Sequence, residues 1–105
     1  MSIKFAEAST FDNLVREDDF VIVDFFSTSC GPCKILSTFL EDLEAELPFL
    51  SIVKVNTMEA PELAERFEIH AVPTLFFYQG GELKERHLGV LDEDELRERI
   101  ERYLY

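Results

Sequence analysis

The residues best suited to chemistry in this chain are Cys30 and Cys33, the only cysteines among its 105 residues. An apolar run at 20–26 precedes them and an amphipathic stretch follows, so the pair is predicted to lie where a helix begins. Two residues with this spacing lie about one helical turn apart, close enough for a disulfide to join them. The free N–H groups and positive dipole end of a helix favour a thiolate on Cys30, whereas Cys33 should be more shielded. This asymmetry predicts thiol–disulfide exchange, in which Cys30 attacks and Cys33 resolves.

A metal site and a pair of inert core cysteines are the alternatives for these two residues. A tetrahedral zinc site usually needs four protein ligands, and the chain has no second cysteine pair. The only histidines, His70 and His87, do not have the spacing of partner ligands, and we expect both to be exposed polar residues. The succession of strand, Cys-x-x-Cys and helix therefore favours a redox site without a metal.

The overall charge narrows the classes of partner. Ten basic and 22 acidic residues give a net charge of −12, which disfavours nucleic acid and anionic membrane surfaces and favours neutral or basic partners. The alternative is that the acidic excess serves solubility alone.

The sequence also bears on the cellular compartment. No apolar stretch approaches the ~20 residues needed to span a bilayer, and residues 1–6 lack the apolar run of a signal peptide. Two closely spaced cysteines do not make the disulfide framework of a small secreted fold. We therefore expect a cytoplasmic protein in a reducing compartment, with no membrane partner.

Alternating strand and helix patterns predict how the cysteines are positioned. Apolar, β-branched and aromatic runs indicate strands at residues 3–6, 20–26, 51–56, 74–78 and 83–88. Helices are expected near residues 11–15 with Ser9 or Thr10 as the cap, from Cys33 to Pro48, from Pro61 to Phe67, and from a capping box at Asp92 to Leu104. Gly80 and Gly81 supply the positive φ angles of a hairpin turn. This order predicts one α/β domain over residues 1–105, with a mixed sheet of about five strands flanked by about four helices.

Several segments give this chain a resemblance to the thioredoxin family over essentially its whole length. The similar segments are Val23-Asp24-Phe25, Cys30-Gly31-Pro32-Cys33-Lys34, Lys54-Val55-Asn56, Val72-Pro73-Thr74, Gly80-Gly81-Glu82 and Gly89. The resemblance implies the thioredoxin fold and a protein-disulfide reductase, because Gly-Pro between the cysteines is typical of the reducing members. It further implies no bound cofactor, re-reduction by NADPH through a thioredoxin reductase, and disulfide-containing client proteins. We expect a monomer.

Asp24 and Lys54 are the candidates for assisting the cysteines. Asp24 interrupts an apolar strand, where a carboxylate is costly to ionise, so its pKa should be raised. The family resemblance implies that Asp24 accepts the proton of Cys33 through a buried water, and that Lys54 modulates it. The alternatives are a structurally bonded or hydrated aspartate at a strand end and a lysine that reaches from the sheet to solvent.

Val72 and Pro73 are the candidates for client binding. A proline before a strand is compatible with a simple strand start. The resemblance implies instead a cis peptide bond that faces the cysteines and leaves the Val72 backbone free to pair with an extended client. A modest apolar docking patch is then expected from Gly31, Pro32, Val72, Gly89 and Val90.

Four positions depart from the family pattern. Ser29 and Phe26 replace two tryptophans, Thr38 replaces a helix proline, and Met58 replaces an aspartate. Ser29 changes the surface beside Cys30, so client and reductase preference are open. A reductase dedicated to one client or linked to glutathione, and a non-catalytic binding module, are the alternative functions.

Overall fold

The computed structural model describes residues 3–105. Its five strands are β1 (Ile3–Phe5), β2 (Phe20–Phe26), β3 (Ser51–Asn56), β4 (Thr74–Gln79) and β5 (Glu82–Leu88). Its four helices are α1 (Phe11–Leu14), α2 (Gly31–Glu46), α3 (Pro61–Arg66) and α4 (Glu93–Leu104). The element order and the fold class are those predicted, and β2 and β3 have the predicted bounds.

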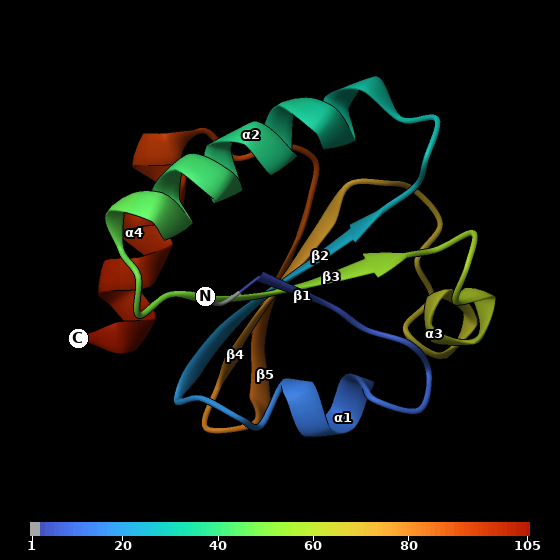
Figure 1. The fold of residues 1–105 in the computed structure, drawn as a ribbon, viewed down its shortest axis with the longest axis horizontal. Coiled ribbons are helices and arrows are strands. Elements are labelled where there is room, and N and C mark those ends of the chain that lie inside the picture. The colour runs from blue at the N-terminus through green and yellow to red at the C-terminus, as the bar shows by residue number, and fades with distance from the viewer. Residues whose placement is uncertain (1–2) are drawn as a thin grey trace.

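The five strands form one mixed sheet in the order β1-β3-β2-β4-β5 (Figure 1). β1 and β2 both run parallel to β3, whereas β4 runs antiparallel to β2 and β5 antiparallel to β4. The parallel part follows from the helical crossovers, and the antiparallel part from the tight turn at Gly80 and Gly81. Both glycines have positive φ, at 59° and 79°, as predicted. In this order the central strands β2 and β3 each have a neighbouring strand on both sides.

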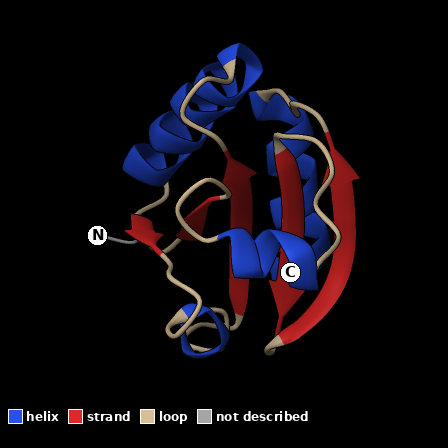
Figure 2. Cartoon of the chain, turned by 90° about the vertical axis from the view of Figure 1, so that its right-hand side faces the viewer, coloured by secondary structure: helices blue, strands red, loops and turns tan. Residues whose placement is uncertain are grey.

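Helices cover both faces of the sheet, and two separate apolar clusters fill the spaces between them (Figures 1 and 2). Leu36, Leu40 and Leu43 of α2 and Leu96 and Ile100 of α4 pack on one face. Phe11 of α1 and Leu63 of α3 pack on the other, around Phe25 and Phe76. Alternate residues of β2 point into the two clusters, which explains why this strand is apolar without a break. Asp24 interrupts that pattern on the α2 face.

Two phenylalanines lie outside the core, and the predicted cap of α1 is not formed by Thr10. Phenylalanines are core residues with two clear exceptions, since Phe5 and Phe49 are 67% and 52% exposed. Phe5 lies on β1, an edge strand of the sheet, where one side of the strand has no neighbour. Thr10 precedes α1, but its hydroxyl bonds to the backbone of Glu7 and does not cap the helix.

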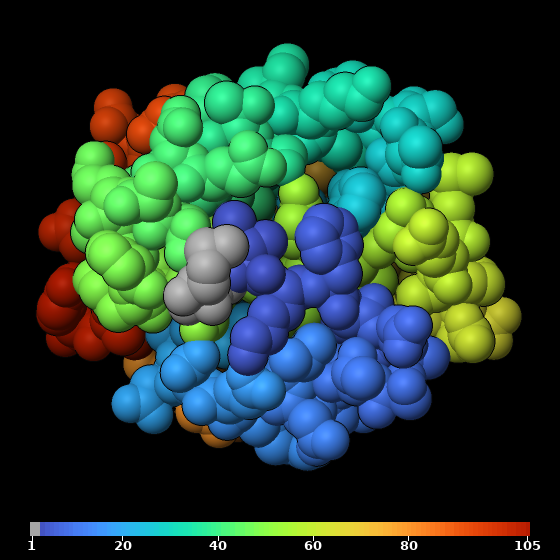
Figure 3. Space-filling model, in the orientation of Figure 1, coloured from blue at the N-terminus to red at the C-terminus, as the bar shows by residue number. Residues whose placement is uncertain are grey.

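The longer helices are close to those predicted, although α2 begins at Gly31, two residues before the predicted Cys33. Asp92 and Glu95 form the capping box of α4 with reciprocal bonds of 2.8 and 3.0 Å. α2 ends at Glu46, just before Pro48, and its residues form the upper part of the surface in Figure 3. Across residues 3–105, none of the helices has the length and apolar character needed to cross a membrane.

Candidate active site

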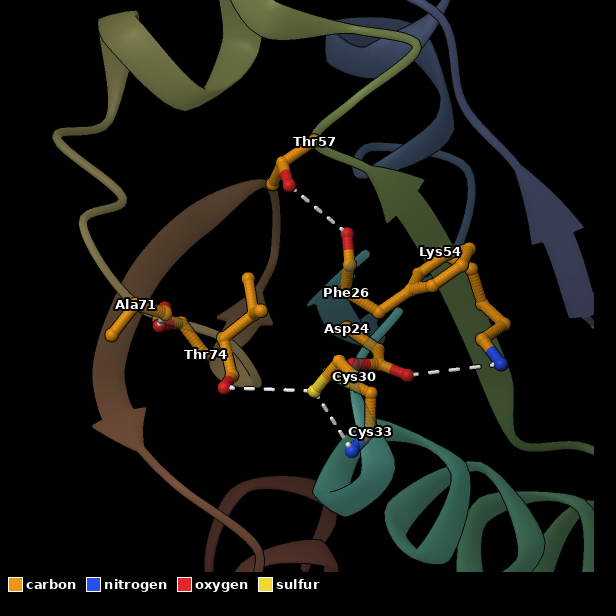
Figure 4. Close-up of a disulfide and its surroundings, with 9 residues drawn as sticks. Asp24, Phe26, Cys30, Cys33, Lys54, Thr57, Ala71 and Thr74 are labelled. Carbon is orange, nitrogen blue, oxygen red and sulfur yellow. Dashed lines mark hydrogen bonds and ion pairs between the residues drawn. A yellow bond between two sulfur atoms is a disulfide. The ribbon is translucent and has the colours of Figure 1, made fainter. Parts of the chain in front are cut away.

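The two cysteines are joined in a disulfide at the start of α2. Their Cα atoms are 5.3 Å apart, and Cys30 is the N-cap residue of the helix. The backbone N–H of Cys33 donates a hydrogen bond of 3.1 Å to Sγ of Cys30 (Figure 4). Cys30 has extended backbone angles because the chain arrives from β2, and Pro32 begins the helix with its φ already set. The sulfur thus takes the place of the side-chain oxygen that normally caps a helix.

The two sulfurs differ in their access to solvent. Cys30 is 9% exposed and Cys33 is 3% exposed, so Cys30 is the more accessible of the two, although it is less exposed than expected. Sγ of Cys30 lies 3.7 Å from the carbonyl oxygen of Val72, which partly covers it. In the disulfide this sulfur carries no hydrogen, but in the reduced form the carbonyl can accept the weak S–H donor.

The loop before β4 brings the predicted client-binding residues next to Cys30. The peptide bond between Val72 and Pro73 is cis, as predicted. The N–H of Gly89 donates a 2.8 Å bond to the carbonyl of Pro73, which fixes the end of β5 beside this loop. Gly31 and Pro32 are exposed at the start of α2, whereas Val72, Gly89 and Val90 are half-buried. The structure therefore places Val72 beside Cys30 and Gly89 beside Pro73, whereas Val90 packs against the apolar cluster under α2.

Asp24 is fully buried on β2, on the face that α2 covers. Among the described residues, neither of its carboxylate oxygens has a hydrogen-bond partner. Burial raises the pKa of Asp24 to about 6, against the opposite effect of the nearby Lys54 ammonium. The alternative of an aspartate held by structural hydrogen bonds to the protein is thus not found.

Lys54 is the register partner of Asp24 on β3, and the two side chains point to the same face. Its Nζ lies 3.8 Å from Oδ2 of Asp24, which is an ion pair too long for a hydrogen bond (Figure 4). The ring of Phe26 lies 5.0 Å from the ammonium, within the range of a cation–π contact. Lys54 is only 8% exposed, so the alternative of a lysine that reaches solvent is wrong.

A pocket of about 240 Å³ opens beside Cys33 and Lys54. It is lined by Phe26, Ser27, Thr28, Cys33, Lys34, Ser37 and Lys54. This pocket gives the resolving side of the disulfide a route to solvent that does not pass Cys30.

Together, the capped sulfur, the second cysteine one turn on and the buried carboxylate form a site for dithiol chemistry. The sequence matches the family model described as thioredoxin over residues 2–102. This chain belongs to the thioredoxin family. A thioredoxin from Chlamydia muridarum (strain MoPn / Nigg) is 39% identical, over 86% of this chain and 96% of its own length. Thioredoxin and its relatives carry out thiol–disulfide exchange with such a pair, and this chain is accordingly a protein thiol–disulfide oxidoreductase.

Two further thioredoxins show how widely this similarity extends. The chloroplastic thioredoxin Y2 of Arabidopsis thaliana is 37% identical over 91% of this chain and 59% of its own length. Among solved structures, a mutant thioredoxin from Halobacterium salinarum NRC-1 superposes with a TM-score of 0.90 at 31% identity. That superposition covers 99% of this chain and 92% of the other. The predicted thioredoxin fold is therefore confirmed.

The residues that depart from the thioredoxin pattern lie in β2, in the loop before α2, in α2 and in the turn after β3. Ser29 is exposed just before Cys30, and Phe26 contacts Lys54. Thr38 lies within α2, where its hydroxyl donates to the carbonyl of Lys34 at 3.1 Å. Met58 is 64% exposed in the loop after β3. Each replacement therefore changes surface or packing and leaves the redox groups in place.

The structure adds residues that the sequence analysis missed. Ser37 lines the pocket and accepts a hydrogen bond from Lys54, and its position four residues after Cys33 on the same helix face was the available signal. Leu88 pairs with Thr74 beside the Pro73 loop and is 66% exposed. His70 is exposed as predicted, whereas His87 is half-buried, and both line a separate pocket of about 330 Å³.

Proposed function

We propose that this thioredoxin reduces client disulfides by a two-step exchange in which Cys30 attacks and Cys33 resolves. The observation that carries the assignment is the 3.1 Å hydrogen bond from the Cys33 N–H to the Cys30 sulfur at the helix start. A donor and a positive dipole end aimed at one sulfur stabilise negative charge on that sulfur. Cys33 receives no comparable bond within residues 3–105 and is more deeply buried.

The exchange conserves atoms and electrons at each step. The Cys30 thiolate forms a bond to one client sulfur, and the client disulfide breaks to release a thiolate. The thiol of Cys33 then loses its proton to Asp24, and its sulfur attacks Cys30 in the mixed disulfide. The Cys30–Cys33 disulfide forms, and the client leaves reduced by two electrons, its two thiolates taking up protons from solvent. In this scheme Lys54 modulates the proton affinity of Asp24.

The client is proposed to bind as an extended segment across Val72 and Pro73. Gly31 and Pro32 follow Cys30 directly, and a Cβ at Gly31 or Gly89 would meet no heavy atom within 4 Å, which leaves room for a backbone to approach. A general reductase acting on many clients needs contacts of this kind, made largely to the backbone. The intact cysteine pair weighs against a module that only binds a partner.

We further propose that NADPH supplies the electrons through a thioredoxin reductase, and that the domain acts as a cytoplasmic monomer without a bound cofactor of its own. Family membership supports a reductase partner, and the net charge of −12 favours a neutral or basic face on it. One relative is a chloroplastic protein, so the same redox chemistry occurs in relatives from more than one compartment, and the cytoplasmic location is proposed independently of it.

Reduction of a model protein disulfide with dithiothreitol as electron source tests the central claim. We expect turnover well above the rate with dithiothreitol alone, and loss of that gain in Cys30→Ser. A wild-type rate equal to background would contradict the proposal. Replacing dithiothreitol with NADPH and thioredoxin reductase, or with glutathione and its reductase, distinguishes the two electron donors.

A further inference from the structure

Ser37 connects the buried charges of the site to the surface of α2. Its hydroxyl oxygen accepts a hydrogen bond from Nζ of Lys54 and donates one of 3.3 Å to Oε2 of Glu41. The ammonium of Lys54 thus bonds to a neutral hydroxyl, while the oppositely charged oxygen of Asp24 stays 3.8 Å away.

The choice of partner requires a cause, because an ammonium bonds more strongly to a carboxylate than to a neutral hydroxyl. Glu41 supplies part of it. Since the Ser37 hydrogen points to the Glu41 carboxylate, a lone pair of the same oxygen is turned towards Lys54. The rings of Phe26 and Phe5 lie 5.0 and 5.9 Å from the ammonium, and Phe26 also lines the pocket beside Lys54. An ammonium released from Ser37 therefore has Asp24 as its nearest charged partner.

We propose that Ser37 is a positioning residue for the resolving step, which holds the Lys54 ammonium away from Asp24 so that the carboxylate keeps its affinity for the Cys33 proton. This inference rests on the proposed role of Asp24 as the proton acceptor. With the ammonium closer, the ionised carboxylate would be stabilised and would take the proton less readily.

Few charged groups face Asp24, so a change in its titration can be assigned to the position of the Lys54 ammonium. Lys54 faces it from β3. From α2 come Cys33, which is joined to Cys30, and, past the Lys54 ammonium, Ser37 and Glu41. From β4 the register partner of Asp24 is Leu75, which is uncharged. The residues of α4 that enter this cluster, Leu96 and Ile100, are also uncharged. Ser37 is neutral, so its hydroxyl can be removed without changing the charge of the site.

The test is the titration of the Asp24 carboxyl, followed by carbon-13 NMR in wild type and in Ser37→Ala. Closing the gap from 3.8 Å to about 2.8 Å at an effective dielectric constant of about 20 should lower the titration midpoint by about one pH unit. Ser37→Thr keeps the hydroxyl and should stay near the wild-type midpoint. Thr38→Ala, which removes an exposed hydroxyl one residue further along α2, is the matched control and should not move the midpoint.

The same variants are then compared in the pH profile of mixed-disulfide resolution, which should move to lower pH only in Ser37→Ala. An unchanged or raised NMR midpoint in Ser37→Ala would overturn the positioning role, whatever the activity. A lowered midpoint with an unchanged pH profile would support the restraint on Lys54 and would instead overturn the proposed role of Asp24. The failure of the inference and the failure of the proposed function are thereby distinguished.

Discussion

Asp24 and Lys54 lie directly opposite each other on adjacent parallel strands, yet their closest charged atoms are 3.8 Å apart. Pairing at that separation offsets only part of the cost of burying the carboxylate, because burial remains the largest influence on its pKa. The centre of the sheet thus contains a carboxyl group that keeps its proton to a higher pH than an ordinary aspartate, close to a redox disulfide (Figure 4).

Asp24→Asn should make the protein more stable near neutral pH and slower in disulfide exchange. The folded pKa is about 6, whereas an unfolded aspartate titrates near ~3.9. The folded state therefore binds more protons between these values, and its stability falls as pH rises through this window. We expect Asp24→Asn to raise the free energy of unfolding by about 1–3 kcal/mol at pH 7, with little gain at pH 4.

Urea unfolding from pH 4 to 8 measures this difference. A variant that is equally or less stable at pH 7, while it remains folded, would contradict a costly buried carboxylate. Resolution of a mixed disulfide should slow in the same variant, because the proton acceptor is gone.

Lys54→Met should raise the pKa of Asp24 further, because the opposing ammonium is removed. The pH window in which stability falls would then extend upward, and the variant should be less stable than wild type at pH 8. Urea melts across pH again provide the measurement. Lys84→Met is the control, since Lys84 pairs with the exposed Glu82 and should leave the pH dependence unchanged. Equal behaviour of the two lysine variants would exclude Lys54 as a modulator.

The two cysteines should react unequally. Limiting iodoacetamide near pH 7 should label Cys30 in preference to Cys33, as judged by peptide mapping of the reduced protein. Cys33→Ser should accumulate mixed disulfides with client proteins, whereas Cys30→Ser should trap almost none, because it lacks the attacking sulfur. Similar trapping by both variants would mean that attacker and resolver are wrongly assigned.

Gly89→Ala should destabilise the protein through its backbone alone. Gly89 has a φ of +102°, and a Cβ there would meet no heavy atom within 4 Å. The expected loss is therefore conformational, about 1–2 kcal/mol. Gly31→Ala is the matched control, since that position is equally open and belongs to the first turn of α2. A loss of stability in Gly31→Ala as large as in Gly89→Ala would rule out this backbone explanation.

The sequence predicted most of the fold because its local signals agree with one another. Each of these signals has a direct physical cause. Burial explains the apolar runs of β2 and β3, and backbone geometry explains Pro61 at the start of α3 and the glycine pair at the hairpin. The exposure of Phe5 could not be read in this way, since it depends on which strand lies at the edge of the sheet. Thr10 shows the same limit, because its hydroxyl has a competing acceptor in Glu7.

The candidate site was predictable where residues lie close together in sequence. The Cys30–Cys33 pair and the buried Asp24 could be recognised from the residues around them. The separation of Asp24 and Lys54 and the bond from Lys54 to Ser37 depend on how β3 and α2 are placed together, which no local pattern specifies. The family resemblance pointed to Lys54, but it gave no reason to examine Ser37.

The 9% exposure of Cys30 has a consequence for which clients this thioredoxin can serve. An attacking sulfur must approach the target in line with the bond that breaks, and Val72 covers one side of that approach. We therefore expect a disulfide that lies flush with a rigid client surface to approach Cys30 less readily than one that projects from it. On this expectation, the recess would favour clients whose disulfides lie on projecting or locally unfolded segments, in addition to those that are readily reduced.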